Sequence, residues 1–137
     1  MKLLVCGGGH LGHAIAGMMA CNGNDVTVMT RRPQKWKRRI VVDFSSDGVS
    51  PTTLTGDLRD VVSCPTGTFD AIIMACPITA MSDIWKKIDG KLSPEIPLVV
   101  VPGRLFSQQV PTCPHPITLV SRVPYICRTS NYGERVS

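Results

Sequence analysis

Short apolar segments alternate with helical patterns along this chain. Residues 2–6 form an apolar run that ends at three glycines, and apolar positions then recur at Leu11, Ile15, Met18 and Met19. This spacing is typical of a helix. An Asn-Gly-Asn sequence ends the pattern, because these residues tolerate the left-handed conformation at a helix end. The pattern therefore predicts a strand, a tight turn and a helix, in that order.

The same reasoning gives the elements that follow. Pro33 is expected to open a turn or short helix through residue 37, and apolar spacing predicts a helix over 78–88. Residues 45–68 are rich in Ser, Thr, Gly, Pro and Asp, and their pattern predicts no element. Apolar runs or alternation predict further strands at 25–30, 40–44, 69–76, 96–101, 117–120 and 125–128.

The order of these elements predicts the fold class. Strands that alternate with helices through short glycine and proline turns specify an open doubly wound sheet. The run at 69–76 is apolar almost throughout, as expected for a strand that is covered on both faces. We therefore predict an α/β fold with a mostly parallel sheet, which binds ligands at the carboxyl ends of its strands.

Length and composition narrow the class of protein. A chain of 137 residues, 43% of them hydrophobic and 18% charged, is expected to form one domain with a buried core. Its apolar runs are far shorter than the roughly 20 residues of a membrane-spanning helix, and we recognise no targeting segment. We therefore expect a cytoplasmic protein with no membrane partner and with its six cysteines free. Zinc-type ligand spacings are missing, so no metal site is expected.

The net charge of +5 comes from one segment. Six of the 15 basic residues lie between positions 31 and 39, a stretch without an acid, and the rest of the chain is nearly balanced. Residues 35–39 are interpreted as a solvated face, the usual role of a charge run. Because Trp36 is the only aromatic residue there, we expect no nucleic-acid partner.

The strongest motif is the G-x-G-x-x-G pattern at residues 7–12, directly after the first predicted strand and at the start of a helix. In this context Gly7 permits the tight turn, Gly9 lets a pyrophosphate approach the backbone, and Gly12 lets the helix pack close to the strand. The helix N-terminus then favours the anionic phosphates. The pattern predicts a dinucleotide-binding domain of the Rossmann type over residues 1–137, the alternative being a glycine turn without a ligand.

The end of the second predicted strand bears on the choice of nucleotide. NAD sites keep an acid about 20 residues after the glycine motif, whereas a 2′-phosphate requires a cation in its place. Here the position holds Thr30, followed by Arg31 and Arg32. An arginine can bind a phosphate through two parallel hydrogen bonds, and Thr30 offers a hydroxyl donor. NADP is therefore favoured over NAD; if the two arginines only face solvent, the choice stays open.

Other residues suggest chemistry less clearly. His10 and His13 lie in or beside the phosphate turn, so we interpret them as structural or cofactor-contacting rather than catalytic. The turn at Cys76 and Pro77 is expected near the nicotinamide half of the crevice, or else is an ordinary strand-ending turn. The Cys76 thiol is expected to be inert, because it lies at the end of a buried strand with no base nearby in sequence.

Several segments together resemble one family. The run from Leu3 to Gly17, the Ala75-Cys-Pro77 turn, the Val101-Pro-Gly103 turn and residues 127–133 resemble the amino-terminal domain of the NAD/NADP octopine (opine) dehydrogenases. The resemblance spans most of the chain, although only the glycine turn is a specific motif. Ketopantoate reductases and 6-phosphogluconate dehydrogenases have the same kind of cofactor domain and fit the remaining segments as well.

The resemblance implies an NAD(P)H-dependent condensation of an amino acid with a 2-oxo acid. In that family a second, mostly helical domain supplies the catalytic residues, and we expect it to begin where this chain stops, so no catalytic residue is carried over. The cofactor residues implied by position are Gly7, Gly9, His10, Leu11, Gly12, Thr30 and Arg31, joined by Arg32.

Two functions follow from these expectations. One is an oxidoreductase whose partners are the nucleotide and, when a substrate domain is supplied, a small amino acid or 2-oxo acid. The other is a non-catalytic NADP-binding sensor or interaction module. An oligomer of identical chains is compatible with both.

Overall fold

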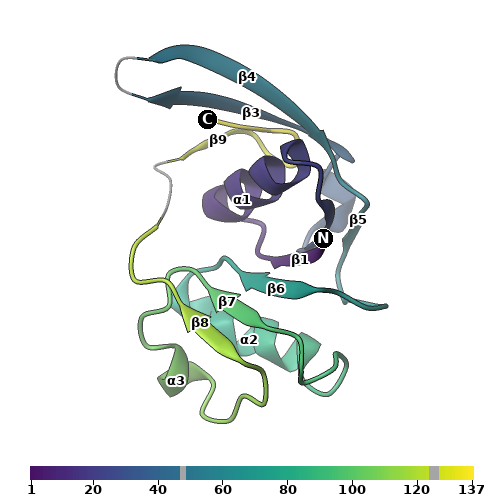
Figure 1. The fold of residues 1–137 in the computed structure, drawn as a ribbon, viewed down its shortest axis with the longest axis vertical. Helices are drawn as coiled ribbons and strands as arrows, with labels where there is room; N and C mark the ends of the chain where they lie inside the picture. The colour runs from purple at the N-terminus through teal and green to yellow at the C-terminus, as the bar shows by residue number, and fades with distance from the viewer. Residues whose placement is uncertain (47–48, 124–126) are drawn as a thin grey trace.

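The structure is a computed structural model that describes residues 1–46, 49–123 and 127–137. Its main sheet has the strand order β5-β2-β1-β6-β7-β8, and each of these pairings is parallel (Figure 1). The predicted parallel α/β architecture is therefore confirmed. The strands are β1 (Lys2–Cys6), β2 (Asp25–Met29), β5 (Asp60–Val62), β6 (Ala71–Met74), β7 (Leu98–Val100) and β8 (Ile117–Leu119).

Helices cover both faces of this sheet. Successive side chains of a strand point to opposite faces, and β1 follows this rule. Its Leu3 and Val5 pack in one apolar cluster with Ile15, whereas Leu4 packs in another with Trp85. The sheet is therefore doubly wound, with helices α1 (His10–Cys21) on one face and α2 (Ile78–Ile88) and α3 (Phe106–Gln109) on the other.

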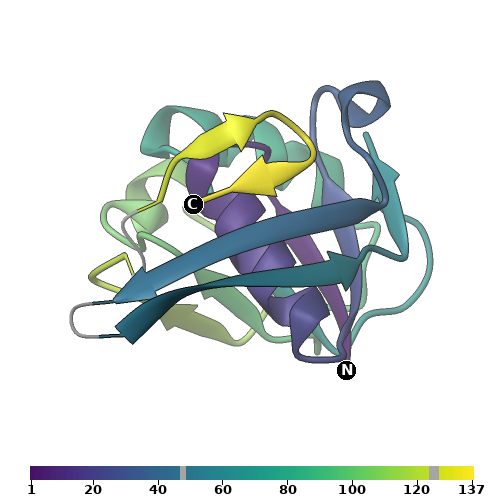
Figure 2. The same cartoon turned by 90° about the horizontal axis from the view of Figure 1, so that it is seen from above.

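A second sheet lies over the outer side of α1, as Figure 2 shows. Its order is β4-β3-β10-β9; β3 pairs antiparallel with β4 and parallel with β10, and β10 pairs antiparallel with β9. The C-terminal hairpin of β9 and β10 is thereby joined to a strand almost 100 residues earlier in the chain. The strands are β3 (Arg39–Ser46), β4 (Val49–Asp57), β9 (Thr129–Asn131) and β10 (Arg135–Val136).

The position of α1 between two sheets explains its composition. The helix contains no aspartate, glutamate, lysine or arginine, and a helix that is apolar on all sides is a buried one. Two glycines bring the layers close together. A Cβ on Gly17 of the helix would lie 2.4 Å from Val42, and one on Gly56 of β4 would lie 2.8 Å from the Ala20 Cβ.

Most predicted elements are found within a few residues of their expected positions, and η1 (Pro33–Lys35) is the expected short helix. Other results differ, and α3, β9 and β10 lie in segments for which no element was predicted. The strand predicted at 40–44 exists as β3 but belongs to the second sheet, and β4 and β5 occupy the segment for which no element was predicted. The strand predicted at 125–128 falls partly outside the described residues, and Cys127 and Arg128 are not in a strand. Within the described ranges, no helix is long and apolar enough to span a membrane.

Candidate functional site

A pocket of about 600 Å³ opens at the carboxyl ends of β1, β2 and β6. The strand order reverses between β1 and β6, and open α/β sheets bind ligands at such a point. Loops after the three strands, one face of α2 and the turn between β9 and β10 form the walls. The lining residues are Gly7, Gly8, Gly9, Met29, Thr30, Arg31, Arg32, Ala75, Cys76, Pro77, Ala80, Asp83, Ile84, Lys86, Lys87 and Tyr132.

The glycines of the first turn have different structural roles. Gly7 has a φ of +141°, and a Cβ there would lie 2.0 Å from the Ala75 carbonyl oxygen. A Cβ on Gly12 would lie 2.1 Å from the Gly7 carbonyl oxygen, so this glycine lets α1 pack against the end of β1. Around Gly9, in contrast, no atom of the other described residues lies within 4 Å of an added Cβ, the neighbours in the chain aside. Space beside Gly9 is therefore open to a ligand, while Gly7 and Gly12 are required by the fold.

The amino end of α1 is suited to an anion. Gly9 is the N-cap residue, no side chain caps the helix, and its first turn holds no acid. The backbone amides of His10 and Leu11 have no hydrogen-bond partner among the described residues. Free amides and the positive end of the helix dipole both attract a phosphate group.

Cationic side chains line the pocket where β2 ends. Thr30 is buried, and its Oγ1 accepts a 3.4 Å hydrogen bond from the Arg32 amide. The side chains of Arg31 and Arg32 are exposed, and neither forms an ion pair with a described residue. Two guanidinium groups are thus available to a ligand at this end of the pocket.

The rest of the basic segment behaves differently from Arg31 and Arg32. Lys37 pairs with Glu134 at 2.8 Å, and Arg39 pairs with Asp57 at 3.0 Å. Arg38 is paired in the same way, with Asp60 at 3.2 Å. All these side chains are largely solvated, in agreement with the surface interpretation of residues 35–39. Trp36 departs from it: the ring is buried and stacks on His13 with a centroid distance of 3.9 Å.

Cys76 and Pro77 line the pocket from the end of β6. Burial raises the pKa of the Cys76 thiol to about 11. Burial, together with the neighbouring Cys76, also raises the pKa of Cys6 far above its ordinary value. Both groups are therefore neutral thiols near pH 7, and the inertness predicted for Cys76 stays a prediction.

The structure brings together seven of the ten residues predicted for the cofactor site; the other three, His10, Leu11 and Gly12, begin α1 outside the pocket lining. The His10 Nδ1 accepts a 2.9 Å hydrogen bond from the Thr129 amide of β9. Leu11 is half-buried against the apolar cluster around α1. A nucleotide contact by these residues stays a prediction and would involve their backbone amides.

His13 has a structural role that follows from its two hydrogen bonds. Its Nε2 accepts a 2.7 Å bond from the Gly133 amide, so the ring is neutral and its Nδ1 donates to the Gly9 carbonyl oxygen at 2.9 Å. Burial lowers the pKa of His13, which favours this neutral form. The side chain thus ties the glycine turn to the C-terminal hairpin.

Sequence reasoning missed one wall of the pocket and its far corner. Ala80, Asp83, Ile84 and Lys87 recur at the spacing of one helix face, a signal that the amphipathic pattern of 78–88 contains. Tyr132, in contrast, reaches the pocket from the hairpin turn, and no local pattern points to it. Across the described ranges, no group of three or more His, Cys, Asp or Glu side chains is arranged to hold a metal ion.

Comparisons with known proteins agree with this architecture. An octopine dehydrogenase, solved in complex with NADH and agmatine, matches with a TM-score of 0.85 and 18% identity. The match covers 99% of this chain and 38% of that one. A PanE/ApbA family ketopantoate reductase from Ralstonia eutropha JMP134 matches with a TM-score of 0.68 and 15% identity, over 99% of this chain and 45% of that one. This chain therefore spans less than half the length of either relative.

The similarity to octopine dehydrogenase confirms the resemblance noted from the sequence and the Rossmann-type fold. A comparison with curated protein sequences gave no significant match. The sequence model of one family, described as ketopantoate reductase PanE/ApbA, matches residues 3–102, which include the glycine turn, β2 and β6. The chain therefore belongs to the ketopantoate reductase PanE/ApbA family, with the nucleotide-binding Rossmann fold of an oxidoreductase.

Proposed function

We propose that this chain is the NADP(H)-binding domain of an oxidoreductase and that it prefers NADP(H) to NAD(H). The observation that carries the proposal is the pair Arg31 and Arg32, which lines the pocket and forms no ion pair with any described residue. A guanidinium group binds phosphate through two parallel hydrogen bonds. At the end of β2, Thr30 stands at the position where NAD sites have an acid that accepts hydrogen bonds from the ribose hydroxyls.

The glycine turn fits the pyrophosphate of such a nucleotide. Gly9 leaves open space beside the backbone, and the free amides of His10 and Leu11 mark an anion site. Cys76 and Pro77 would lie toward the nicotinamide end. The described residues would bind and orient the nucleotide, and the bound nucleotide would supply a hydride.

For the whole enzyme we propose reduction of a 2-oxo acid, or of the imine that such an acid forms with an amino acid. Support comes from the family and from octopine dehydrogenase, which has been solved with NADH and pyruvate and with NADH and L-arginine. Hydride transfer requires the substrate to be held against the nicotinamide, and this pocket supplies one wall of such a cleft. We therefore expect this chain alone to bind the nucleotide without turning over substrate.

A non-catalytic sensor or interaction module is the second candidate. Four exposed apolar side chains are compatible with both candidates, because exposed apolar groups can mark surfaces that bind other protein. They lie in or near α3 and β8 and are between 43% and 51% exposed: Leu105, Ile117, Leu119 and Val123.

Parallel calorimetric titrations with NADPH and NADH test the proposal. We expect NADPH to bind more tightly than NADH. Arg31→Ala should weaken the binding of NADPH about 10-fold or more, because hydrogen bonds to a charged group are lost, and it should change the binding of NADH little. Arg39→Ala is the matched control, because that arginine pairs with Asp57 outside the pocket lining. Equal affinities for the two nucleotides would refute the NADP preference, and binding of neither would mean that the glycine turn is only structural.

A further inference from the structure

Two hydroxyl groups converge on the second glycine of the turn. A Cβ on Gly8 would lie 2.4 Å from the Thr30 Oγ1 and 2.8 Å from the Tyr132 hydroxyl oxygen. Thr30 follows β2, whereas Tyr132 lies in the turn between β9 and β10. Both side chains also line the pocket, beside Arg31 and Arg32. The C-terminal hairpin therefore places a phenol hydroxyl at the cationic end of the pocket.

The backbone and its neighbours fix the position of Tyr132. The Gly133 amide donates to His13, and the Gly133 carbonyl oxygen accepts a 2.8 Å hydrogen bond from the Lys37 amide. Gly133 has a φ of +79°, and a Cβ there would lie 2.1 Å from the Lys35 carbonyl oxygen. The turn therefore cannot shift without breaking contacts to both α1 and η1.

The Tyr132 ring packs edge-on against two buried rings. Its centroid lies 5.0 Å from that of His13 and 6.2 Å from that of Trp36, the two rings that stack on each other. Edge-to-face contacts of this kind are favourable and directional. The hydroxyl has no hydrogen-bond partner among the described residues, and the side chain is 38% exposed. A positioned donor thus remains available to a ligand.

We infer that Tyr132 is a specificity-determining residue that donates a hydrogen bond from its hydroxyl to the 2′-phosphate of NADP(H). This inference rests on the proposed nucleotide function. Phosphate oxygens accept several hydrogen bonds at once, and phosphate sites commonly combine guanidinium groups with hydroxyl donors. Thr30, Arg31 and Tyr132 would then surround the phosphate from the end of β2 and from the C-terminal hairpin.

The variant Tyr132→Phe tests the inference, because it removes the hydroxyl and keeps the ring against His13. Affinities are measured for NADPH and NADH, and for the half-ligands 2′,5′-ADP and 5′-AMP. We expect about a tenfold loss for the two ligands that carry a 2′-phosphate, and less than about a twofold change for the other two, because they lack the accepting group.

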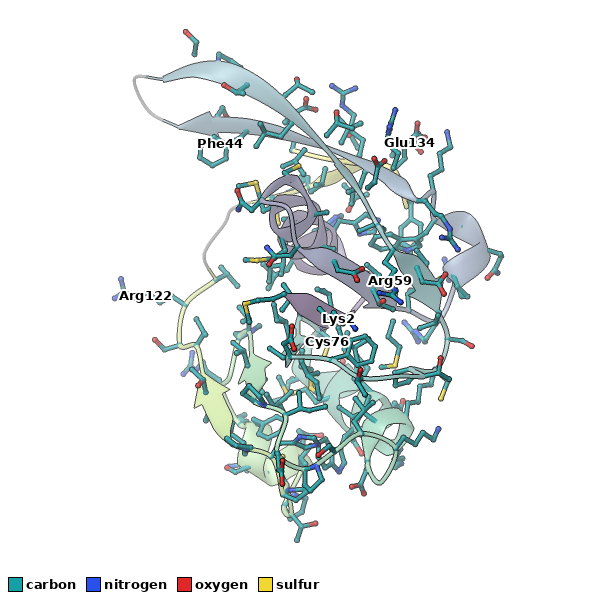
Figure 3. All side chains as sticks on the ribbon, turned by 45° about the vertical axis from the view of Figure 1, so that its right-hand side comes forward. Lys2, Phe44, Arg59, Cys76, Arg122 and Glu134 are labelled. Atoms are coloured by element: carbon teal, nitrogen blue, oxygen red, sulfur yellow. The ribbon has the colours of Figure 1, made fainter. Side chains whose placement is uncertain are left out.

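Phe44→Leu is the control. Phe44 is also 38% exposed, but it lies on β3 outside the pocket lining, and Figure 3 shows it well apart from Cys76. Thermal unfolding of Tyr132→Phe checks that the hairpin remains folded. An equal loss for all four ligands would place the hydroxyl on a shared part of the nucleotide and overturn the inference, as would no loss. Failure of the wild-type chain to bind NADPH would overturn the proposed function itself.

Discussion

A methyl group added at Gly9 should weaken nucleotide binding, whereas one added at Gly12 should destabilise the fold. Gly9 has a φ of −86°, which alanine adopts without strain, and beyond the chain neighbours no atom in the described part of the chain lies within 4 Å of the added Cβ. The Cβ of Gly12→Ala would instead lie 2.1 Å from the Gly7 carbonyl oxygen and 2.8 Å from the Gly7 carbonyl carbon. These are backbone atoms, so relief requires α1 to move away from β1.

The magnitudes follow from these contacts. Gly9→Ala should change the free energy of unfolding by no more than about 1 kcal/mol, the scale of N-cap effects. In the bound state its methyl group would occupy the approach to the α1 amides. Loss of one hydrogen bond to a charged group costs about 1.5–3 kcal/mol, so NADPH should bind about 10- to 100-fold more weakly. Gly12→Ala should cost about 3 kcal/mol through overpacking and lower the Tm by about 10 °C.

The assay combines thermal unfolding with NADPH titration for both variants and for Gly90→Ala. Gly90 has a φ of +67° and open space around it, and it lies outside the pocket lining. This control should therefore lose about 1 kcal/mol of stability and keep its affinity. Wild-type affinity in Gly9→Ala would refute the assignment of this space to the pyrophosphate. A Gly12→Ala variant as stable as the wild type would refute the packing argument.

Two further predictions concern titrating groups. His13 is held neutral, with its pKa lowered by burial, so below the ordinary value of 6.5 the unfolded chain binds more protons than the folded one. The free energy of unfolding, measured with urea, should therefore fall as the pH decreases from about 7.5 to 5.5. His13→Asn should make this decrease smaller. A variant with the same dependence of stability on pH as the wild type would contradict the role of the Gly133 bond. Buried Cys76 should be alkylated by iodoacetamide at pH 7 more slowly than half-buried Cys64, whose Sγ accepts a 2.9 Å hydrogen bond from Lys91. Mass spectrometry measures the two rates, and equal rates would refute this prediction.

The main sheet could be predicted because its strands are buried on both faces. The segments around β1 and β6 then read as unbroken apolar runs, and the glycines between β1 and α1 mark the turn. The pocket residues after β1 and β2 were accessible to the same reasoning, because a local motif and its distance to the next strand end specify both.

The second sheet could not be predicted, because its outer face is solvated. β4 has the sequence VSPTTLTGD, with a proline and four hydroxyl residues, and only Leu54 among its described apolar side chains packs on the core beneath. Polar strands of this kind resemble loops in composition. The pairing of β10 with β3 is equally hidden from the sequence, because it joins Arg135 to Val41 across almost the whole chain.

The basic segment shows how such long-range pairing determines which cations remain available in the pocket. From sequence, the cations at 31–39 form one stretch without an acid, and the distance from the glycine motif to the end of the second strand is what sets Arg31 and Arg32 apart from the later members. In the structure, acids from β4, β5 and the C-terminal hairpin pair with the later members and leave the first two arginines to the pocket. The same hairpin that contributes Glu134 to this pairing also brings Tyr132 over the glycine turn. Under the proposed assignment, the second sheet completes the part of the pocket that selects the nucleotide, because its C-terminal hairpin brings Tyr132 there only when it is folded against α1.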